Sequence, residues 1–553
     1  MGLILTGRHT ALALSVSMLL LATAPVHAQS SQSTQPGDGT QSTPVAPSLP
    51  ATTLVAPISP LAIGGAAVVR PMWTFNPRIS VDTAFTDNAR GAPPGQRESD
   101  LYTSISPGFV GDLYLQHHRA TIDYGFTRRM YAFDQDLNNN QHSLSASTQS
   151  EVVNEIFFID TQMSLSDTTL NSQGRVSADP TVQFDENSAL IATFSASPFL
   201  RYQLDHYVNF ETRYRYGRTL SLTEGAQDQQ SHHFTQTAAS GSDFDRFSWG
   251  ALLDGGWEDF SGQATFGPSG DRRNENYRGV GSIDLPISRA FSLVLGGGYE
   301  TIKDDTLTDQ PDGFIWNVGF RYKPGPRTTL QLGFGDRYDR KRFSGGLSYL
   351  ISQRSSLTVS YGQSIRSTSP TANNSVAFLA PDGFGNLVDV RTGQALSFTD
   401  SLFGVTSATF FSDRIDATLS LGHGLGTSTF TFFYEKRSGS NVQSDEDGMG
   451  FSYGYGRPLN SVLSMGFNAS VTKTETVGST PATTQATAIN VNNFTNSPEG
   501  TEVVTLSAGG SLNYTISDTM SGTLSYRFLN RDSTESGGNS IENVVTAGIR
   551  KSF

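Results

Sequence analysis

The segment Val462–Thr472, VLSMGFNASVT, alternates strictly between apolar side chains and polar or small ones. Successive side chains of a β-strand point to opposite faces of the sheet, so this pattern predicts a strand with one face suited to hydrocarbon and the other to water. Similar alternation recurs through most of the chain up to the terminal aromatic residue Phe553. The apolar set is Leu463, Met465, Phe467, Ala469 and Val471, and the polar or small set is Ser464, Gly466, Asn468, Ser470 and Thr472.

This recurring pattern predicts an all-β fold, a transmembrane antiparallel β-barrel. A bilayer core offers no partners to backbone N–H and C=O groups, so a spanning chain must be helical or a closed sheet. A spanning helix needs about 20 consecutive apolar residues, and no stretch after residue 28 approaches that length. From Arg78 onward we mark about 22 strand candidates, with any even number from roughly 18 to 24 compatible with the pattern. A secreted β-sandwich or β-helical adhesin is the alternative, although its strands would be shorter.

The composition excludes several kinds of function. The chain has 553 residues, 55 glycines, no cysteine and a formal charge of −13. Without cysteine it has no disulfides, thiolate metal sites or thiol nucleophiles. Its net negative charge argues against a nucleic-acid partner. The pairs His117-His118 and His232-His233 would each divide between the two faces of a strand, which disfavours a shared metal site. We find no catalytic motif, so we expect no enzyme, catalytic residue, metal site or cofactor.

The N-terminal region predicts an exported protein. Residues 1–28 combine Arg8, an apolar run from Ala11 to Leu21 and the sequence Val26-His27-Ala28, which is typical of a cleaved signal peptide. Residues 29–75 are rich in Ser, Thr, Gln and Pro, so we expect a disordered periplasmic segment. The barrel is then expected over residues 76–553, in the cell outer membrane of a Gram-negative bacterium.

The last strand carries a further signal. Val545, Ala547, Ile549 and Phe553 share one face, as in the C-terminal signal that the barrel-assembly machinery reads. Lys551 departs from this pattern. A lysine on the lipid face costs several kcal/mol at mid-bilayer but only about 0 to 1 kcal/mol near an interface, so this position is tolerable.

Charged residues that face the lumen are the best candidates for a functional role, because barrels filter solutes by pore radius and by rings of charge. They could set selectivity, or they could pair and brace the wall, and bracing is slightly favoured because buried charges are usually paired. By strand parity the candidate lumen and selectivity residues are Glu211, Arg213, Arg215, Glu300, Arg321, Arg342 and Arg527, with Asn209, Asp123 and Asp416 on the same side.

The connections differ in length, with short turns such as Ser517-Asp518 alternating with long ones such as Thr168 to Glu186. The connection Ser369 to Phe410 is too long for a simple loop in a compact protein. We predict that it constricts the pore, with Phe384, Asp389 and Arg391 near the solute path, and an outward flap over the rim is equally compatible.

The acidic clusters at Asp304, Asp305, Asp309 and Asp312 and at Asp445-Glu446-Asp447 lack EF-hand spacing, so solvated loop charge is favoured over a cation site.

Three short motifs resemble a poorly characterised family of outer-membrane barrels found beside exopolysaccharide and exosortase (PEP-CTERM) genes, related to the β-barrel porins. The motifs are Thr86-Asp87-Asn88-Ala89, Ser106-Pro107-Gly108, and Leu396 with Thr399-Asp400 ahead of the strand at Ile415. The resemblance spans about Pro77 to Phe553. It implies a barrel with a role in envelope or polysaccharide transport, and it supplies no catalytic residues.

Two functional hypotheses follow. The first is a porin-like channel for solute passage or exopolysaccharide export. The second is a structural or adhesive barrel with a closed lumen and interacting extracellular loops. The expected partners are outer-membrane lipid and lipopolysaccharide, the barrel-assembly machinery, and polysaccharide or periplasmic export components. A TonB-dependent receptor is less favoured, because the region before Arg78 is short and polar for a folded plug.

Overall fold

The computed structural model describes residues 72–553 apart from 171–173, 183, 185–186, 224–225, 245, 265–267, 338–339, 367–378, 382–386, 390–393, 396–407, 441–444, 478–500 and 535–537. The expected signal peptide, residues 1–28, and all but the end of the expected tail lie outside the described residues. In the described part of the chain, no helix has the length and apolar character needed to cross a membrane.

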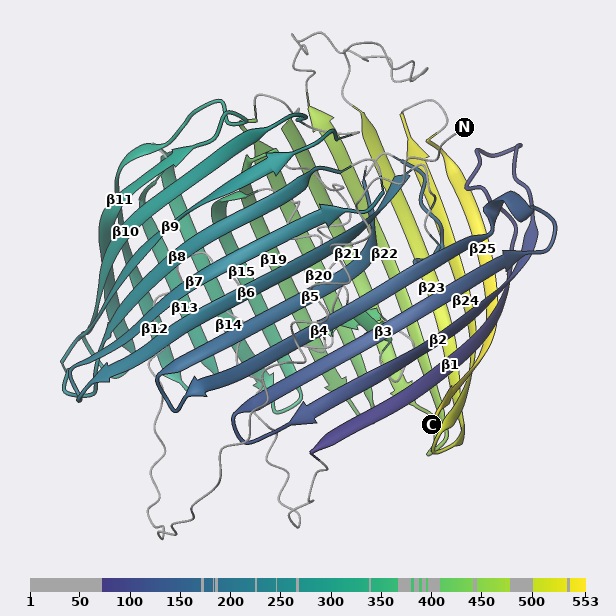
Figure 1. Ribbon diagram of the computed structural model, residues 1–553, viewed down its shortest axis with the longest axis horizontal. Coiled ribbons are helices and arrows are strands. Elements are labelled where there is room, and N and C mark those ends of the chain that lie inside the picture. Colours follow the sequence, from purple (N-terminus) through teal and green to yellow (C-terminus); the bar gives the residue numbers. More distant parts are fainter. Residues whose placement is uncertain are drawn as a thin grey trace, which may run out of the picture. The chain divides into compact units, whose positions relative to one another are not determined.

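Twenty-two antiparallel strands form one closed sheet, which confirms the predicted fold class and strand number. Each strand pairs with its neighbour in sequence, and β1 pairs with β25 to close the barrel (Figure 1). The first eleven strands are β1 (Trp73–Thr86), β2 (Asp100–Tyr114), β3 (His118–Tyr131), β4 (Asn139–Val153), β5 (Phe157–Thr169), β6 (Ser188–Leu204), β7 (Val208–Ser221), β8 (Asp228–Ser240), β9 (Ser248–Ser261), β10 (Arg272–Pro286) and β11 (Phe291–Lys303). The other eleven are β12 (Asp312–Gly325), β13 (Thr328–Arg337), β14 (Arg340–Ser352), β15 (Ser355–Arg366), β19 (Phe410–His423), β20 (Gly426–Ser438), β21 (Asp445–Pro458), β22 (Leu463–Val477), β23 (Glu502–Ser517), β24 (Met520–Ser533) and β25 (Ser540–Ser552).

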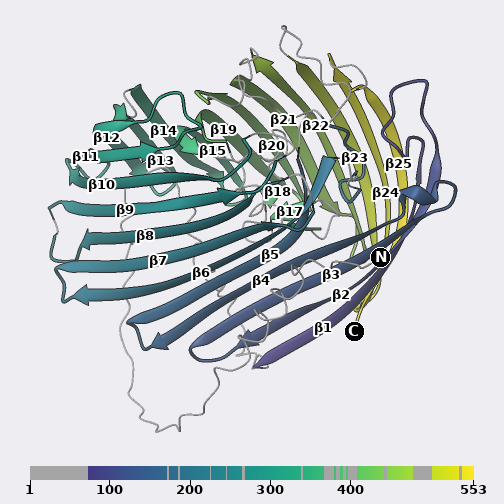
Figure 2. The same cartoon turned by 45° about the horizontal axis from the view of Figure 1, so that its top comes forward.

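Two small elements lie outside this sheet. The 3₁₀ helix η2 (Gln135–Leu137) follows β3. The strands β16 (Leu379–Pro381), β17 (Leu387–Asp389) and β18 (Gln394–Ala395) form a separate three-stranded sheet within the connection between β15 and β19. In Figure 2 the barrel strands run obliquely, as in tilted membrane barrels.

The register divides the wall into an apolar outer face and a polar lumen face. In β22 and β23 the pairs Phe467↔Gly510, Ala469↔Ala508 and Val471↔Leu506 face outward, while Asn468↔Gly509, Ser470↔Ser507 and Thr472↔Thr505 face the lumen. Outer side chains of other strands are strongly exposed, among them Leu253, Phe314 and Phe343 at 59%, 69% and 58%.

Charged residues on the outer face of the described strands occur only near strand ends, as Arg273, Lys303 and Lys436 do. A band without charges around the middle of the wall is what a hydrocarbon core requires, and it places this barrel in a membrane. The alternation in Val462–Thr472 is therefore the pattern of a strand between lipid and lumen.

The closing pair β1–β25 is secured by polar groups at one end. Asn88 is fully buried, and its Nδ2 donates to the carbonyl oxygens of Ala92 (2.8 Å) and Ile541 (3.0 Å). Asn543 donates from its backbone N and its Nδ2 to the Asp87 carboxylate at 2.7 and 2.8 Å. The Thr86-Asp87-Asn88-Ala89 motif thus fastens the first strand to the last.

The first strand starts earlier than expected. β1 begins at Trp73, within the segment that we assigned to the tail, because Trp73 and Phe75 continue the outward alternation of the strand. At the other terminus Val545 and Ile549 face outward at 45% and 51% exposure. The outward Lys551 donates from Nζ to Thr519 Oγ1 at 2.9 Å and lies over the Phe553 ring, which satisfies its ammonium group at the barrel end. Recognition by the assembly machinery stays a prediction.

Candidate functional site in the lumen

A long connection folds inward against a neighbouring part of the lumen wall, two to six strands away. It joins β5 to β6, and we call its described residues 174–182, 184 and 187 the inner loop. The inner loop contacts side chains of β2, β3, β24 and β25. Along the sheet, β24 lies six strands from β5, which is roughly 29 Å of wall at about 4.8 Å per strand. A connection that spans this distance crosses the lumen side of the barrel.

Asp179 is the centre of these contacts and is 4% exposed. Its carboxylate accepts hydrogen bonds from the Tyr102 hydroxyl at 2.7 Å and from Arg527 Nη1 at 3.2 Å. The Thr181 backbone N and Oγ1 donate to the same carboxylate at 3.0 and 2.9 Å, which fixes the turn of the loop. Arg527 lies near the middle of β24, so this ion pair ties the loop to the wall away from the end of that strand.

Two wall residues hold the loop backbone. The Ala178 N–H donates to Glu542 Oε2 at 2.6 Å, and the Ser177 hydroxyl donates to the same carboxylate oxygen at 3.0 Å. Arg129, which is 1% exposed, donates from Nη2 to the Thr181 carbonyl oxygen at 2.9 Å. These groups would each be costly to leave unpartnered in a buried setting, so they specify the docked position.

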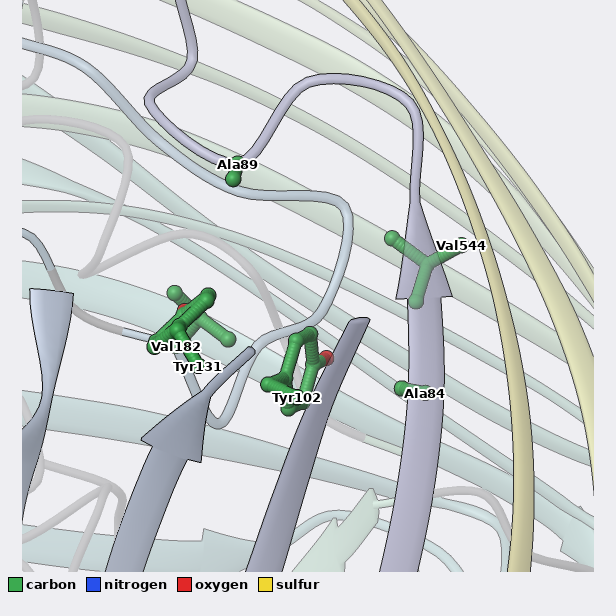
Figure 3. Close-up of a cluster of buried hydrophobic side chains, with 6 residues drawn as sticks. All are labelled: Ala84, Ala89, Tyr102, Tyr131, Val182 and Val544. Atoms are coloured by element: carbon green, nitrogen blue, oxygen red, sulfur yellow. The ribbon is translucent and has the colours of Figure 1, made fainter. Parts of the chain in front are cut away.

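Apolar side chains pack beneath the polar contacts. Val182 of the inner loop joins the wall residues Tyr102, Tyr131 and Val544 in one buried cluster, which Ala84 and Ala89 complete (Figure 3). Figure 3 shows Val182 and Tyr131 side by side, next to Tyr102. Docking of the inner loop therefore combines apolar burial with the Asp179 and Glu542 contacts.

Docking of the inner loop also perturbs the pKa of Asp179. Burial by itself would raise the pKa of this carboxyl, but the charge of Arg527, the Tyr102 hydrogen bond and the charge of Arg129 hold the pKa below its ordinary value. Asp179 is therefore ionised at neutral pH, and the ion pair with Arg527 is formed.

A second connection reaches inward over another part of the mouth. Residues 304–311, between β11 and β12, contact the start of β19 and the end of β20. The Thr409 N–H donates to Thr306 Oγ1 at 3.0 Å, and the Thr308 N–H donates to the Gly439 carbonyl oxygen at 2.9 Å. Leu307 is 1% exposed and packs with Ile302 and Phe411. We call residues 304–311 the crossing loop.

Most of the predicted lumen residues pair with other groups of the wall. Arg213 lies 3.1 Å from Asp160 and 3.0 Å from Glu211, and its guanidinium stacks 3.8 Å from the Phe199 ring centroid. Arg321 pairs with Asp284. Glu300 accepts from Arg337 Nε at 2.5 Å, and Arg342 donates to the Gln363 carbonyl oxygen. These contacts support bracing of the wall, and a role in selectivity stays a prediction.

Arg215 and Arg527 differ from the rest. Arg215 faces the lumen beside His233 and Arg213, and no described carboxylate lies within ion-pair distance of it. Arg527 pairs with the inner loop rather than with the wall. Among the predicted arginines, these two are therefore not braced by a carboxylate of the wall.

The structure does not test the prediction that the connection Ser369 to Phe410 constricts the pore. Phe384 and Arg391 lie outside the described residues, and Asp389 is known only as the end of β17. A different connection, the inner loop, lies against the lumen wall. The sequence Ser177-Ala178-Asp179-Pro180 has turn-forming residues, but turn chemistry alone does not reveal which way a loop folds.

In the acidic cluster around Asp304, Asp305, Asp309 and Asp312 are exposed as expected, whereas Asp304 itself is buried. Asp304 is 2% exposed, accepts hydrogen bonds from Thr306 and lies 3.8 Å from Arg272, because the crossing loop folds inward and takes it along. Asp312 accepts from the Tyr299 hydroxyl at 2.6 Å. Among the residues that the structure describes, no group of His, Asp and Glu side chains has metal-binding geometry.

Comparison with solved structures supports the fold. The siderophore receptor PirA from Acinetobacter baumannii matches with a TM-score of 0.50 and 11% identity, over 86% of this chain and 80% of that chain. The iron transporter FrpB from Neisseria meningitidis matches with a TM-score of 0.48 and 10% identity, over 86% and 81%. No family model and no curated protein matches the sequence. The closed sheet, its apolar outer band and this likeness define the chain as a 22-stranded β-barrel of the outer membrane.

Proposed function

We propose that this barrel is a conduit for hydrophilic solutes whose mouth is narrowed by the inner loop and the crossing loop. The observation that carries the proposal is the pairing of Asp179 with Arg527, which holds a connection against the lumen wall. When the loop leaves the wall, the polar groups that held it would face the aqueous lumen and exchange their partners for water, so a loop held this way can be released without unfolding the sheet.

The lumen wall is suited to carbohydrate. Lumen-facing residues such as Thr505 and Ser507 offer partly exposed hydroxyl groups, and paired Arg and carboxylate groups add charge-assisted donors and acceptors. Together with the family resemblance, this supports export of an exopolysaccharide as the finer proposal. The siderophore and iron named for the two similar structures have no counterpart among the observations on this chain, because the likeness extends to the fold alone.

Single-channel conductance of the reconstituted barrel tests the conduit. Asp179→Asn removes the charge that Arg527 binds, and Asp518→Asn in the exposed turn between β23 and β24 is the matched control. We expect the first variant to open more often or more widely than the wild type and the second to leave conductance unchanged. Liposome swelling with neutral and acidic sugars then separates carbohydrate passage from ion passage.

The docked loops also favour a second candidate, a barrel with a closed lumen whose outer loops bind a partner. This function predicts a silent barrel in the planar bilayer for the wild type and for Asp179→Asn alike. Conductance thus distinguishes the two functions.

A further inference from the structure

The outer face of the barrel carries the same five-residue arrangement twice. In each copy a strand with the pattern Tyr-x-aromatic-x-Arg pairs with a strand that has an amide residue and a histidine two positions apart. We call these sets the outer-face clusters. The first contains Tyr124, Phe126 and Arg128 of β3 with Asn140 and His142 of β4, and the second contains Tyr214, Tyr216 and Arg218 of β7 with Gln230 and His232 of β8.

The two outer-face clusters have the same register and the same contacts. Arg128 lies opposite Asn140, and Arg218 lies opposite Gln230. Each arginine donates from Nη1 to the amide oxygen opposite, at 3.1 Å in the first cluster and 2.9 Å in the second.

The histidine contacts repeat as well. The Tyr124 hydroxyl lies 3.0 Å from His142 Nδ1, and the Tyr214 hydroxyl lies 2.7 Å from His232 Nδ1. The second aromatic residue of the pattern packs on the imidazole, with ring centroids 5.0 Å apart in the first cluster and 5.3 Å in the second. In the second cluster Trp257 also stacks on His232 at 4.8 Å. Recurrence of this detail on two separate hairpins points to a common purpose.

The arginines of the clusters differ from three outer-face cations that have a carboxylate partner. Lys473 lies 3.0 Å from Glu502, Arg273 lies 2.6 Å from Asp259, and Lys303 lies 3.6 Å from Glu275. Arg128 and Arg218 each pair with a neutral amide instead, and neither makes an ion pair with a described carboxylate. Their charges are therefore available to an external anion.

The height of the clusters on the barrel wall indicates which kind of anion they meet. Both arginines lie near the ends of their strands at the side of the long connections, on the same face as the lipid-exposed Ile122 and Phe234. At this height of a barrel, aromatic and long cationic side chains meet lipid headgroups. A guanidinium can donate two parallel hydrogen bonds to one phosphate group. The tyrosine–histidine pair supplies a further polar group below it.

We propose that the two outer-face clusters are equivalent binding sites for the phosphate groups of lipids in the outer leaflet. Each guanidinium binds a phosphate, and the aromatic residues pack along the lipid beneath it. The inference is independent of what passes through the lumen.

Lipid retention by the detergent-purified full chain, counted by native mass spectrometry, tests the inference. The probes are bis-phosphorylated lipid A and the same glycolipid after phosphatase treatment. We expect the wild type to retain two molecules of the phosphorylated probe, and to bind the dephosphorylated probe about tenfold or more weakly. Equal retention of both probes would overturn the proposal, and this comparison needs no variant.

Variants locate the sites. We expect Arg128→Gln and Arg218→Gln each to lose one retained molecule and the double variant to lose both. Lys473→Gln, which removes an outer-face cation that is already ion-paired, serves as the control and should retain two. Retention of both molecules by a folded double variant, judged by its heat-modifiable mobility, would show that the clusters are ordinary interfacial aromatic residues.

Discussion

Arg527 Nη1 donates to Asp179 Oδ1 at 3.2 Å, although the two residues are 348 positions apart in the chain. This ion pair joins the inner loop to the middle of β24. Removing one partner leaves the other charge buried without its counterion, and such changes typically cost about 3 to 5 kcal/mol. Arg527 is 30% exposed, so solvent screens its share and the cost here is smaller.

The first prediction concerns this pair. Arg527→Gln and Asp179→Asn should each release the inner loop, and the double variant should be little worse than either single variant, because both remove the same interaction. The fraction of docked loop can be measured by the reactivity of a single cysteine placed at Val182, since the chain has no cysteine of its own. Strictly additive effects of the two substitutions would argue that the residues act separately.

A second prediction is a pH dependence that belongs to Asp179. Its pKa is lower when the loop is docked than when the loop is free, so docking is stabilised above the ordinary aspartate pKa of about 4. That stabilisation is lost as the pH falls through the lower pKa that Asp179 has in the docked state. Conductance of the wild type should rise in this acid range. The Asp179→Asn variant should lack this step. It is measured beside the wild type because a second carboxylate, Glu542, also faces the loop.

A third prediction concerns the crossing loop. Leu307→Ala removes a fully buried side chain from its contacts with Ile302 and Phe411, at a typical cost of about 2 to 5 kcal/mol. Because the strands keep their backbone pairing while the loop loses its anchor, we expect higher conductance and unchanged resistance of the barrel to heat in detergent. A drop in heat resistance with unaltered conductance would show that Leu307 stabilises the barrel without narrowing it.

The fourth prediction separates selectivity from bracing. Arg215→Gln should lower anion preference, seen as a shift of reversal potential in a salt gradient, because this lumen cation has no described ion-pair partner. Arg213→Gln should instead reduce stability, because Asp160 and Glu211 lose their common partner. An unchanged reversal potential in Arg215→Gln would remove Arg215 from the solute path.

The alternation of apolar and polar residues was sufficient to predict the barrel, its strand number and the side of the wall on which residues such as Arg213 lie. That is so because side-chain direction in a strand has a strict period of two. It was not sufficient to predict the inner loop, because the partners of Asp179 come from β2, β3 and β24, and no local pattern links these strands to residues 174–182. The start at Trp73 was missed because the residues directly before it, 61–72, are mostly small and apolar and show no period of two that would mark the start of a strand.

The Asn88 contacts show how a short motif acquires its meaning from three dimensions. Within the sequence, Thr86-Asp87-Asn88-Ala89 supported only a family resemblance. In the barrel, Asp87 and Asn88 bind β25, and Ala89 packs in the cluster beneath the inner loop. Asn88→Ala should therefore weaken the closing pair, by about 1 to 3 kcal/mol for the buried groups left unpartnered, and lower the temperature of heat modification.

The most direct test of the account is conductance with the inner loop reversibly fixed. Cysteines at Ala178 and Ala84, which pack in the same cluster, can be joined by a short cleavable bis-thiol reagent in this cysteine-free chain. The account predicts that the cross-linked barrel stays in its low-conductance state at acid pH and that cleavage of the cross-link restores opening. Equal conductance of the cross-linked and cleaved forms would contradict a lumen controlled by this loop.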